Sequence, residues 1–583
     1  MKINYKFTIR IYDLTLKAII VKQIGICMRK VYTILFLVYF GLALKAAPAR
    51  PGKVTLTQPD GTTIIVELRG DEHFHYYADA QNRMLIQDRA GYYQVATAEQ
   101  IAQKQANNAK STRCADHPSV IPGVFPTTGT VKGLVILVQY PDVPFTVDNP
   151  KEVFGDLVNQ QNYDGGLATG SVRDFFNDQS LGKFDPVFEV TEPVTLSQNM
   201  YYYGGISGGD NVNAMIEEAC FLANRTQNID FSEFDNNNDG FVDFIYVIYS
   251  GYGRAQGGPV GSVWPQASSL EYYTFKAFDG VYLGRYACSS ELRGNSSTET
   301  DGIGTFCHEF GHILGLPDIY DVAYSGFNGM SHYDIMDIGL YNNNARTPAG
   351  MTAMDRYSIG WLEPRILEPR QEPYQLDAFE TTNEAYFMVS AHDPNEYFTF
   401  ENRQPTKWDA HVPGHGLLIS QIHYVPSLWA SNAVNTQTSK YEHVRLVSAN
   451  NETGSPLFES QDVFPSSANK TTFPAGTAKD CYWYGTEEAI PTLTNIALTD
   501  GMISFNYPTP TGVEEHVAFD ATVRVYVADG TLCVENKSDG EVNVYTIGGI
   551  LFHTDEAASF TLSLPVGTYV VSHKTGSKKI VVK

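Results

Sequence analysis

The stretch from His308 to Asp318 constrains the chain more than any other, because it joins a helical histidine pair to a helix terminator. His308 and His312 stand four positions apart, so on a helix both imidazoles lie on one face, one turn apart. Two imidazoles in this arrangement supply half of a tetrahedral zinc site. Glu309 follows the first histidine and falls beside such a metal, where a general base belongs.

The residues after this predicted helix supply a third ligand. Gly315 permits positive φ and so ends the helix in a sharp turn, and Pro317 prevents the helix from resuming. The chain can then return Asp318 toward the two imidazoles. Three protein ligands leave a fourth position open for water, which is typical of a catalytic zinc ion. His332 is a rival third ligand, and the alternative interpretation is an amphipathic helix with two surface histidines.

Composition narrows the class of protein. The 583 residues carry a formal net charge of −24 and include 36 Tyr and 32 Phe. The length predicts about three or four domains, and the aromatic content indicates a β-rich chain. The acidic balance argues against a nucleic-acid partner, whose phosphates require Lys and Arg. The seven cysteines form no paired C-x-x-C motif, and their connectivity does not follow from the sequence.

The amino terminus has the pattern of a secretory signal peptide. A basic pair at residues 29–30 precedes an apolar run over residues 31–44, and small residues follow. Cleavage is expected between Ala46 and Ala49. The apolar run is short for a membrane span, and no later segment has the pattern of a transmembrane helix. Residues 1–47 are therefore interpreted as an upstream extension and signal peptide.

Residues 48–127 have the pattern of a small β domain followed by a polar linker. Alternating runs at 53–57 and 62–68 predict strands. A small domain between a signal peptide and a zinc-binding helix is interpreted as a propeptide. In the linker, the thiolate of Cys114 is a candidate to occupy the fourth zinc position and keep the enzyme latent. Asp116 is a rival switch, and an idle linker cysteine is the alternative.

A second metal site is predicted upstream of the histidine helix. Oxygen ligands recur at alternating positions, with Gly240 sixth for the sharp turn, as in a calcium loop. The twelfth position is Tyr246 rather than Glu, which excludes an ordinary EF-hand, and an Asn/Asp-rich turn is the alternative. The predicted ligands are the side chains of Asp235, Asn237, Asp239 and Asp243 and the carbonyl of Phe241.

The later segment 282–288 is expected to be an edge strand able to pair with a peptide.

Several runs together resemble the immune inhibitor A family of secreted bacterial metallopeptidases, which is metzincin-like. They are Ser171–Phe176, His308–Asp321, Tyr333–Gly339 and Gly360–Leu362. The resemblance implies endopeptidase activity on proteins and structural calcium. It also implies zinc ligation by His308, His312 and Asp318, with Glu309 as base. In metzincins a Met turn lies below the zinc, and Met336 is the candidate here.

The carboxyl-terminal regions are predicted to be β-rich. Residues 366–507 are expected to form a β-sandwich that packs on the enzyme. Residues 508–583 begin with a Pro/Gly linker and continue as short strands. This last region resembles the C-terminal sorting domain of type IX secretion, which implies export by that machinery and attachment to the outer cell surface. A plain accessory β-sandwich is the alternative.

The sequence therefore predicts an α+β chain with a metzincin-like zinc peptidase domain at 128–365, a propeptide-like domain before it and two β-sandwich domains after it. The predicted function is a secreted endopeptidase with one catalytic zinc, acting on proteins or peptides, with no nucleic acid and no transmembrane span. The oligomeric state stays open. A surface-binding protein on a degenerate zincin and a zinc hydrolase of non-peptide amides are the alternatives.

Overall fold

The computed structural model describes residues 45–582 with gaps. The gaps are 72–74, 89, 102–124, 207, 272, 275, 323–326, 437–440, 451–459, 467–468, 475–482, 485–489, 509–522, 529–530, 538–539, 547–550, 557–558, 565–566 and 575. The chain divides into two compact units. The first comprises residues 1–367 with 375–505, and the second comprises 368–374 with 506–583. Each unit is described by itself.

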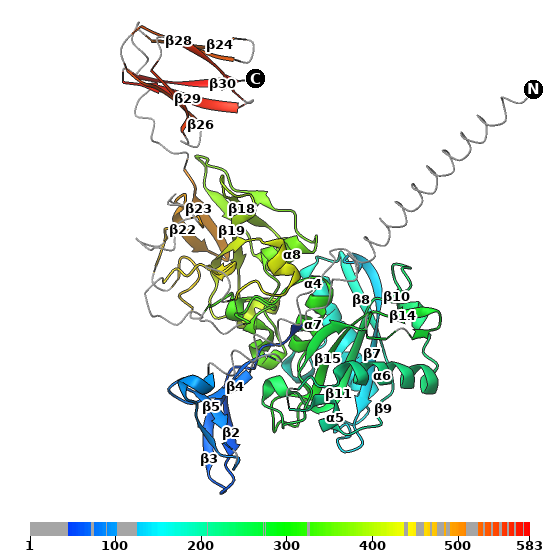
Figure 1. Ribbon diagram of the computed structural model, residues 1–583. Helices are drawn as coiled ribbons and strands as arrows, with labels where there is room; N and C mark the ends of the chain where they lie inside the picture. The colour runs from blue at the N-terminus through cyan, green and yellow to red at the C-terminus, as the bar shows by residue number, and fades with distance from the viewer. Residues whose placement is uncertain are drawn as a thin grey trace, which may run out of the picture. The chain divides into compact units, whose positions relative to one another are not determined.

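A mixed sheet forms the centre of the first unit, with the strand order β12-β15-β11-β7-β8. Figure 1 labels β15, β11, β7 and β8 of this sheet. The inner strands run parallel, while β12 runs antiparallel to β15. The strands are β7 (Gly129–Gln139), β8 (Phe184–Val190), β11 (Ile245–Tyr252), β12 (Gln266–Ser269) and β15 (Arg285–Leu292). Short β9 (Val194–Thr195) pairs with β7, and β10 (Phe241–Val242), β14 (Val281–Leu283) and β13 (Ala277–Phe278) form a separate sheet.

The apolar run of β7 explains the layering. Val135 and Leu137 belong to one buried core, while Ile136 and Val138 belong to another, as the two-residue period of a strand requires. Helix α6 (Val212–Gln227) fills the second core, and α3 (Pro150–Asn159), α4 (Val172–Gln179) and α7 (Gly304–Ile313) fill the first. Both faces of the sheet are therefore covered, which matches the near-continuous hydrophobicity of its parallel strands.

Helix α4 illustrates how local sequence fixes these elements. Ser171 accepts the N–H of Asp174 at 3.1 Å, and the Asp174 carboxylate accepts the N–H of Ser171 at 2.9 Å. This capping box satisfies two amides at the helix start. One turn later, the Phe176 ring meets Phe310 of α7 edge-on, with 4.9 Å between centroids. The cap thus sets α4 so that it supports the histidine helix.

The expected edge strand at 282–288 is wrong in its position. Strand β15 lies between β11 and β12, and β12 is the strand at that side of the main sheet. Strand β1 (Lys45–Ala46), from the amino-terminal end of the described chain, adds antiparallel to β12. The strand that can pair with an extended peptide at this side of the sheet is therefore β12 and not β15.

The rest of the first unit consists of antiparallel sheets and short helices. Strands β2 (Lys53–Thr57), β3 (Thr63–Gly70), β4 (His75–Ala78), β5 (Met84–Gln87) and β6 (Tyr93–Val95) pair in sequence order. A later sheet has the order β16-β18-β19-β20-β21, and a smaller one β17-β23-β22. In the order just given, the strands of the five-stranded sheet are Arg365–Ile366, Ala385–Val389, Glu396–Arg403, Gly416–His423 and Val444–Leu446. Those of the three-stranded sheet are Tyr374–Leu376, Met502–Asn506 and Thr494–Thr499. The short helices are α5 (Met200–Gly204), α8 (Ala353–Ser358), α9 (Phe379–Thr382) and α10 (Pro426–Ala430).

The second unit contains two antiparallel sheets that share one buried apolar core. One sheet has the order β24-β25-β28 (Val523–Ala528, Thr531–Asn536, Ser559–Ser563). The other has the order β27-β26-β29-β30 (Leu551–Asp555, Val542–Thr546, Gly567–His573, Gly576–Val582). Within the described part of the chain, no helix combines the length and apolarity needed to cross a membrane.

Candidate metal centre

Helix α7 presents both histidines with a fixed tautomer. His308 donates from Nδ1 to the carbonyl of Ile335 at 2.8 Å, and His312 donates from Nδ1 to the carbonyl of Leu316 at 2.8 Å. A carbonyl oxygen can only accept, so Nδ1 carries the proton on each ring. The lone pair of each Nε2 therefore faces the same space. Backbone carbonyls that accept a proton from Nδ1 in this way orient metal-binding imidazoles.

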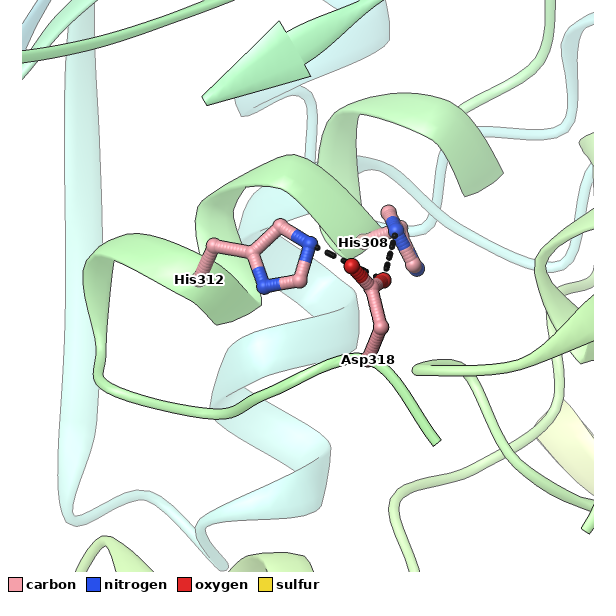
Figure 2. A group of neighbouring side chains, drawn as sticks. All are labelled: His308, His312 and Asp318. Atoms are coloured by element: carbon pink, nitrogen blue, oxygen red, sulfur yellow. Dashed lines mark ion pairs between the residues drawn. The ribbon is translucent and has the colours of Figure 1, made fainter. Parts of the chain in front are cut away.

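Asp318 completes a three-ligand set, as Figure 2 shows. Its Oδ1 lies 3.3 Å from Nε2 of His308 and 3.2 Å from Nε2 of His312. All three donor atoms lie within 4.8 Å of one another, and all three residues are buried. Gly315 takes φ 107°, the left-handed conformation that turns the chain back after the helix.

The donor atoms fit a zinc ion. Among the described residues, Nε2 of His308 and Oδ1 of Asp318 are buried atoms with no hydrogen-bond partner, an arrangement that is costly without a ligand. Two neutral imidazoles and an ionised carboxylate form the donor set that catalytic zinc prefers.

Asn432 holds the third ligand, and sequence reasoning missed it. Its amide donates to Oδ2 of Asp318 at 2.5 Å, and its Oδ1 accepts the backbone N–H of Asp318 at 2.7 Å. Asn432 takes φ 51°, which Asn tolerates better than most residues. The only sequence signal is therefore an asparagine suited to a left-handed turn, far downstream in the β-rich region.

The turn around Met336 lies directly against the histidine helix. Ile335 provides the carbonyl that receives His308, and the buried Asp334 accepts the N–H of Met336 at 2.8 Å. A Cβ built on Gly311 of α7 would lie 2.6 Å from Sδ of Met336. The thioether therefore packs on the backbone of the helix between the two histidines, and its role as a supporting Met turn stays a prediction.

Glu309 faces a segment of the chain's own amino-terminal region. Its Oε1 accepts the backbone N–H of Ala47 at 2.9 Å, and the indole of Trp264 donates to the carbonyl of Ala47 at 2.7 Å. Tyr341 donates to the carbonyl of Pro48 at 2.7 Å. The backbone of residues 47–48 thus lies directly against the predicted base and its neighbours.

Other candidates lie elsewhere. His332 pairs through Nδ1 with Oδ1 of Asn342 at 2.8 Å and is not part of the ligand group. Glu291, a buried carboxylate on β15, accepts the N–H groups of Thr146, Val147 and Gly251, so it has a structural role. Cys114 and Asp116 lie outside the described residues, as does the predicted signal sequence up to residue 44.

The predicted calcium loop forms a turn held by its own side chains, and among the described residues its carboxylates do not form a three-ligand group like that of His308. Asp235 accepts the N–H groups of Asp239 and Gly240, and Asp239 accepts that of Phe241. Asn237 also accepts the N–H of Asp239, at 2.8 Å. Burial raises the pKa of Asp243 to about 6, although the N–H of Asn236 bonds to its carboxylate. The loop is therefore an acidic turn of suitable ligand type, and its metal stays a prediction.

A two-faced α/β sheet with a His-Glu-x-x-His helix and a returning Asp defines a metallopeptidase domain. Residues 127–364 match the family model described as "Immune inhibitor A peptidase M6, catalytic domain", which confirms the predicted resemblance. The matched region ends before Asn432, so the family model does not include the residue that holds Asp318.

Two curated relatives agree with the family match. The chain is 27% identical over 305 residues to "Pre-pro-metalloprotease PrtV" of Vibrio cholerae serotype O1, covering 44% of this chain and 33% of the relative. It is 26% identical over 235 residues to "Immune inhibitor A" of Bacillus thuringiensis subsp. alesti, covering 33% of this chain and 34% of the relative. The chain thus matches about one third of the length of these relatives.

Proposed function

We propose that the chain is a secreted zinc-dependent endopeptidase that hydrolyses internal peptide bonds, with Glu309 as general base. The observation that carries the proposal is the convergence of His308, His312 and Asp318 on one point, with Glu309 beside them. The match to the M6 catalytic domain supports it. The proposal concerns the whole chain, of which the matched domain is one part.

The residues of the site divide the chemistry among them. A zinc ion held by the three ligands would act as a Lewis acid toward water and the scissile carbonyl. Glu309 takes a proton from the attacking water and delivers it to the leaving amine. The N–H of Ala47, 2.9 Å from Glu309, lies where a leaving nitrogen would lie. The carbonyls of Ile335 and Leu316 keep both imidazoles in the orientation that ligation requires.

The edge of the main sheet offers a way to bind proteins or peptides. Lys45 and Ala46 pair antiparallel with Ala267 and Gln266 of β12. An extended substrate can form the same backbone hydrogen bonds, which depend little on side chains. Protein and peptide substrates are therefore the class that we propose, and both rivals, the binding protein and the hydrolase of other amides, lack a comparable structural argument.

The same segment provides a mechanism of latency. In the unprocessed chain Ala47 bonds to the base itself and Lys45–Ala46 pair with β12, so a substrate cannot bind until these residues leave. The predicted signal-peptide cleavage between Ala46 and Ala49 would itself begin to release them, and we assign the propeptide-like role to the residues that remain before and within the sheet β2–β6. Switching by Cys114 or Asp116 stays a prediction. Calcium in the 235–243 loop, export by type IX machinery and attachment to the outer surface are further proposals from the sequence.

Zinc content measured together with casein cleavage tests the function. The matured chain should carry about one zinc ion and cleave casein at internal bonds, and chelation should abolish cleavage. Glu309→Ala should keep zinc and lose turnover, whereas His308→Ala should lose both. Exposed Glu233→Ala is the matched control and should resemble the wild type. Zinc absent from a folded chain, or activity retained by Glu309→Ala, would overturn the proposal.

A further inference from the structure

We propose that the site beside Glu309 includes a subsite for an Arg or Lys side chain of the substrate, formed by Gln256, Asn344 and the buried Asp301. The subsite lies on the leaving-amine side of the bond that is cleaved. This inference rests on the proposed peptidase function and names a class of substrate for it.

The amino-terminal segment shows how a cation is bound there. Arg50 donates from Nη1 to Oε1 of Gln256 at 3.2 Å and from Nη2 to Oδ1 of Asn344 at 2.8 Å. Its backbone N–H donates to the carbonyl of Ala255 at 2.8 Å, which anchors the residue at this position. Two side-chain carbonyls thus receive the two ends of one guanidinium group, a geometry that suits its fixed fork of donors.

The amide of Gln256 has its orientation fixed by its neighbours. Its Oε1 also accepts the N–H of Gly294 at 2.9 Å, while its Nε2 donates to the carboxylate of Asp301 at 2.9 Å. The oxygen must therefore face Arg50, and the nitrogen must face Asp301. Gln256 is only 6% exposed, so this acceptor is preorganised and not recruited by the cation.

Asp301 adds negative charge behind the amide. It is 4% exposed, and Thr305 donates to its Oδ2 at 2.9 Å. Burial raises its pKa, and the charge of Arg50 acts in the opposite direction. A carboxylate that polarises the amide in front of it favours a cation and disfavours an acidic side chain. The site therefore selects by charge as well as by hydrogen bonding.

A strained turn presents the second acceptor. Asn343, Asn344 and Ala345 take φ of 47°, 60° and 63° in succession, a left-handed run that side chains disfavour. Asn343 is tied back through Nδ2 to Oγ1 of Thr347 at 3.0 Å and does not bind Arg50. The turn thus directs Asn344 to the guanidinium, and Asn343 provides a matched control in the same strained conformation.

The position of Glu309 gives the register. Ala47 donates its N–H to Glu309 and so corresponds to the first residue after the cleaved bond. Arg50 is then the fourth residue on that side. A substrate that follows the same path places its own fourth residue in the subsite. We therefore expect preferred cleavage of sequences with Arg or Lys at this position.

Quenched peptides test this selectivity on the matured chain. The peptides share one sequence and carry Arg, citrulline or Ala at the fourth position after the cleaved bond. The wild type should favour Arg over citrulline about tenfold in kcat/KM, because citrulline keeps the shape and loses the charge. Asn344→Gly keeps the left-handed backbone without the acceptor and should lower this ratio, while Asn343→Gly should keep it.

Hydrogen exchange of the unprocessed chain provides a measurement that does not depend on activity. Arg50→Gln and Asn344→Gly should each speed exchange of the amides of Ala47 and Arg50 severalfold, whereas Asn343→Gly should not. Equal cleavage of the Arg and citrulline peptides, or unchanged exchange in Arg50→Gln, would overturn the subsite and leave the peptidase intact. Failure to cleave any peptide would instead overturn the proposed function and the substrate preference with it.

Discussion

Asn432 and Asp318 form a reciprocal pair of hydrogen bonds across 114 residues of sequence. The amide of Asn432 fixes the carboxylate of Asp318, and its oxygen fixes the backbone beneath that carboxylate. The third ligand is therefore positioned by the β-rich region and not by the metallopeptidase domain alone. We therefore expect zinc binding to require both the metallopeptidase domain and the β-rich region.

Replacement of Asn432 should weaken metal binding. Asn432→Gly keeps the left-handed backbone and removes both hydrogen bonds, and losses of this kind lower metal affinity about 10–100-fold. Competition with a chromogenic chelator measures the affinity. Exposed Asn495, which also takes positive φ, is the matched control as Asn495→Gly. Equal zinc affinity in the two variants would contradict a positioning role for Asn432.

Removal of the segment beside Glu309 should activate the unprocessed chain. Deletion of residues 45–50 is expected to raise the initial rate of casein cleavage before any maturation, because it frees Glu309. Trp264→Phe should do so partially, since it removes only the donor to the Ala47 carbonyl. Partly buried Trp429→Phe is the control. An unprocessed chain that is fully active without these changes would rule out this form of latency.

The contact between Gly311 and Met336 should appear as coupling between the two positions. Gly311→Ala gains up to about 1 kcal/mol of helix propensity, but a Cβ 2.6 Å from Sδ of Met336 overpacks the turn at a cost of about 1–3 kcal/mol. Urea unfolding of both single variants and of the Gly311→Ala, Met336→Ala double variant measures the coupling. We expect the added methyl to be tolerated better once Met336→Ala has removed the thioether, and additive effects would show that the contact is not tight.

Glu401 should make stability depend on pH. Burial raises its pKa from 4.5 to about 7, and the nearby Arg403 offsets this only in part. The folded state therefore binds more protons than the unfolded state between these values. The contribution of this group to the unfolding free energy is full below pH 4.5 and is lost as pH rises through about 7.

Urea unfolding at about pH 5 and pH 7 measures this effect. The decrease in unfolding free energy should be smaller in Glu401→Gln than in the wild type. Partly exposed Glu384, which pairs with Arg365, is the control as Glu384→Gln. If all three proteins lost the same free energy over this range, Glu401 would not be the responsible group.

Calcium should stabilise the chain through the 235–243 loop. Ligand that binds only the folded state at about 100 times its Kd adds about 2.7 kcal/mol, so excess calcium should raise Tm. Asp239→Asn removes one carboxylate and should reduce this increase, while Asp60→Asn in the amino-terminal sheet should not. A wild-type Tm that does not respond to calcium or to a calcium-selective chelator would leave the loop as an ordinary turn.

The sequence predicts the local part of the site well. The histidine pair, the positive φ of Gly315 and the return of Asp318 all follow from determinants within one short stretch. The apolar run at 131–140 likewise predicts β7, because a strand that is buried on both faces is hydrophobic at nearly every position. These features depend on neighbouring residues, for which the rules of periodicity and capping are sufficient.

The remaining contacts depend on pairing between distant segments. Strand β12 has the sequence Gln-Ala-Ser-Ser, which lacks the β-branched and aromatic residues that signal a strand. The stronger signal at 282–288 therefore predicts the edge in the wrong place. The hydrogen bond from Ala47 to Glu309 spans 262 residues, and no local pattern encodes it. Whether the chain forms separate domains at the predicted boundaries is likewise a question of long-range packing.

Strand β1 also has a consequence for solubility. While it pairs with β12, it covers the backbone groups of Gln266 and Ala267 at that side of the sheet. Maturation would expose this short edge, and an extended segment of another molecule could then pair with it. Such pairing between edge strands is the first step of sheet aggregation. Gln266–Ser269 are polar or small, so the uncovered edge offers little apolar surface to hold such a contact. A weak strand signal at this edge is thus also a safeguard for the matured molecule.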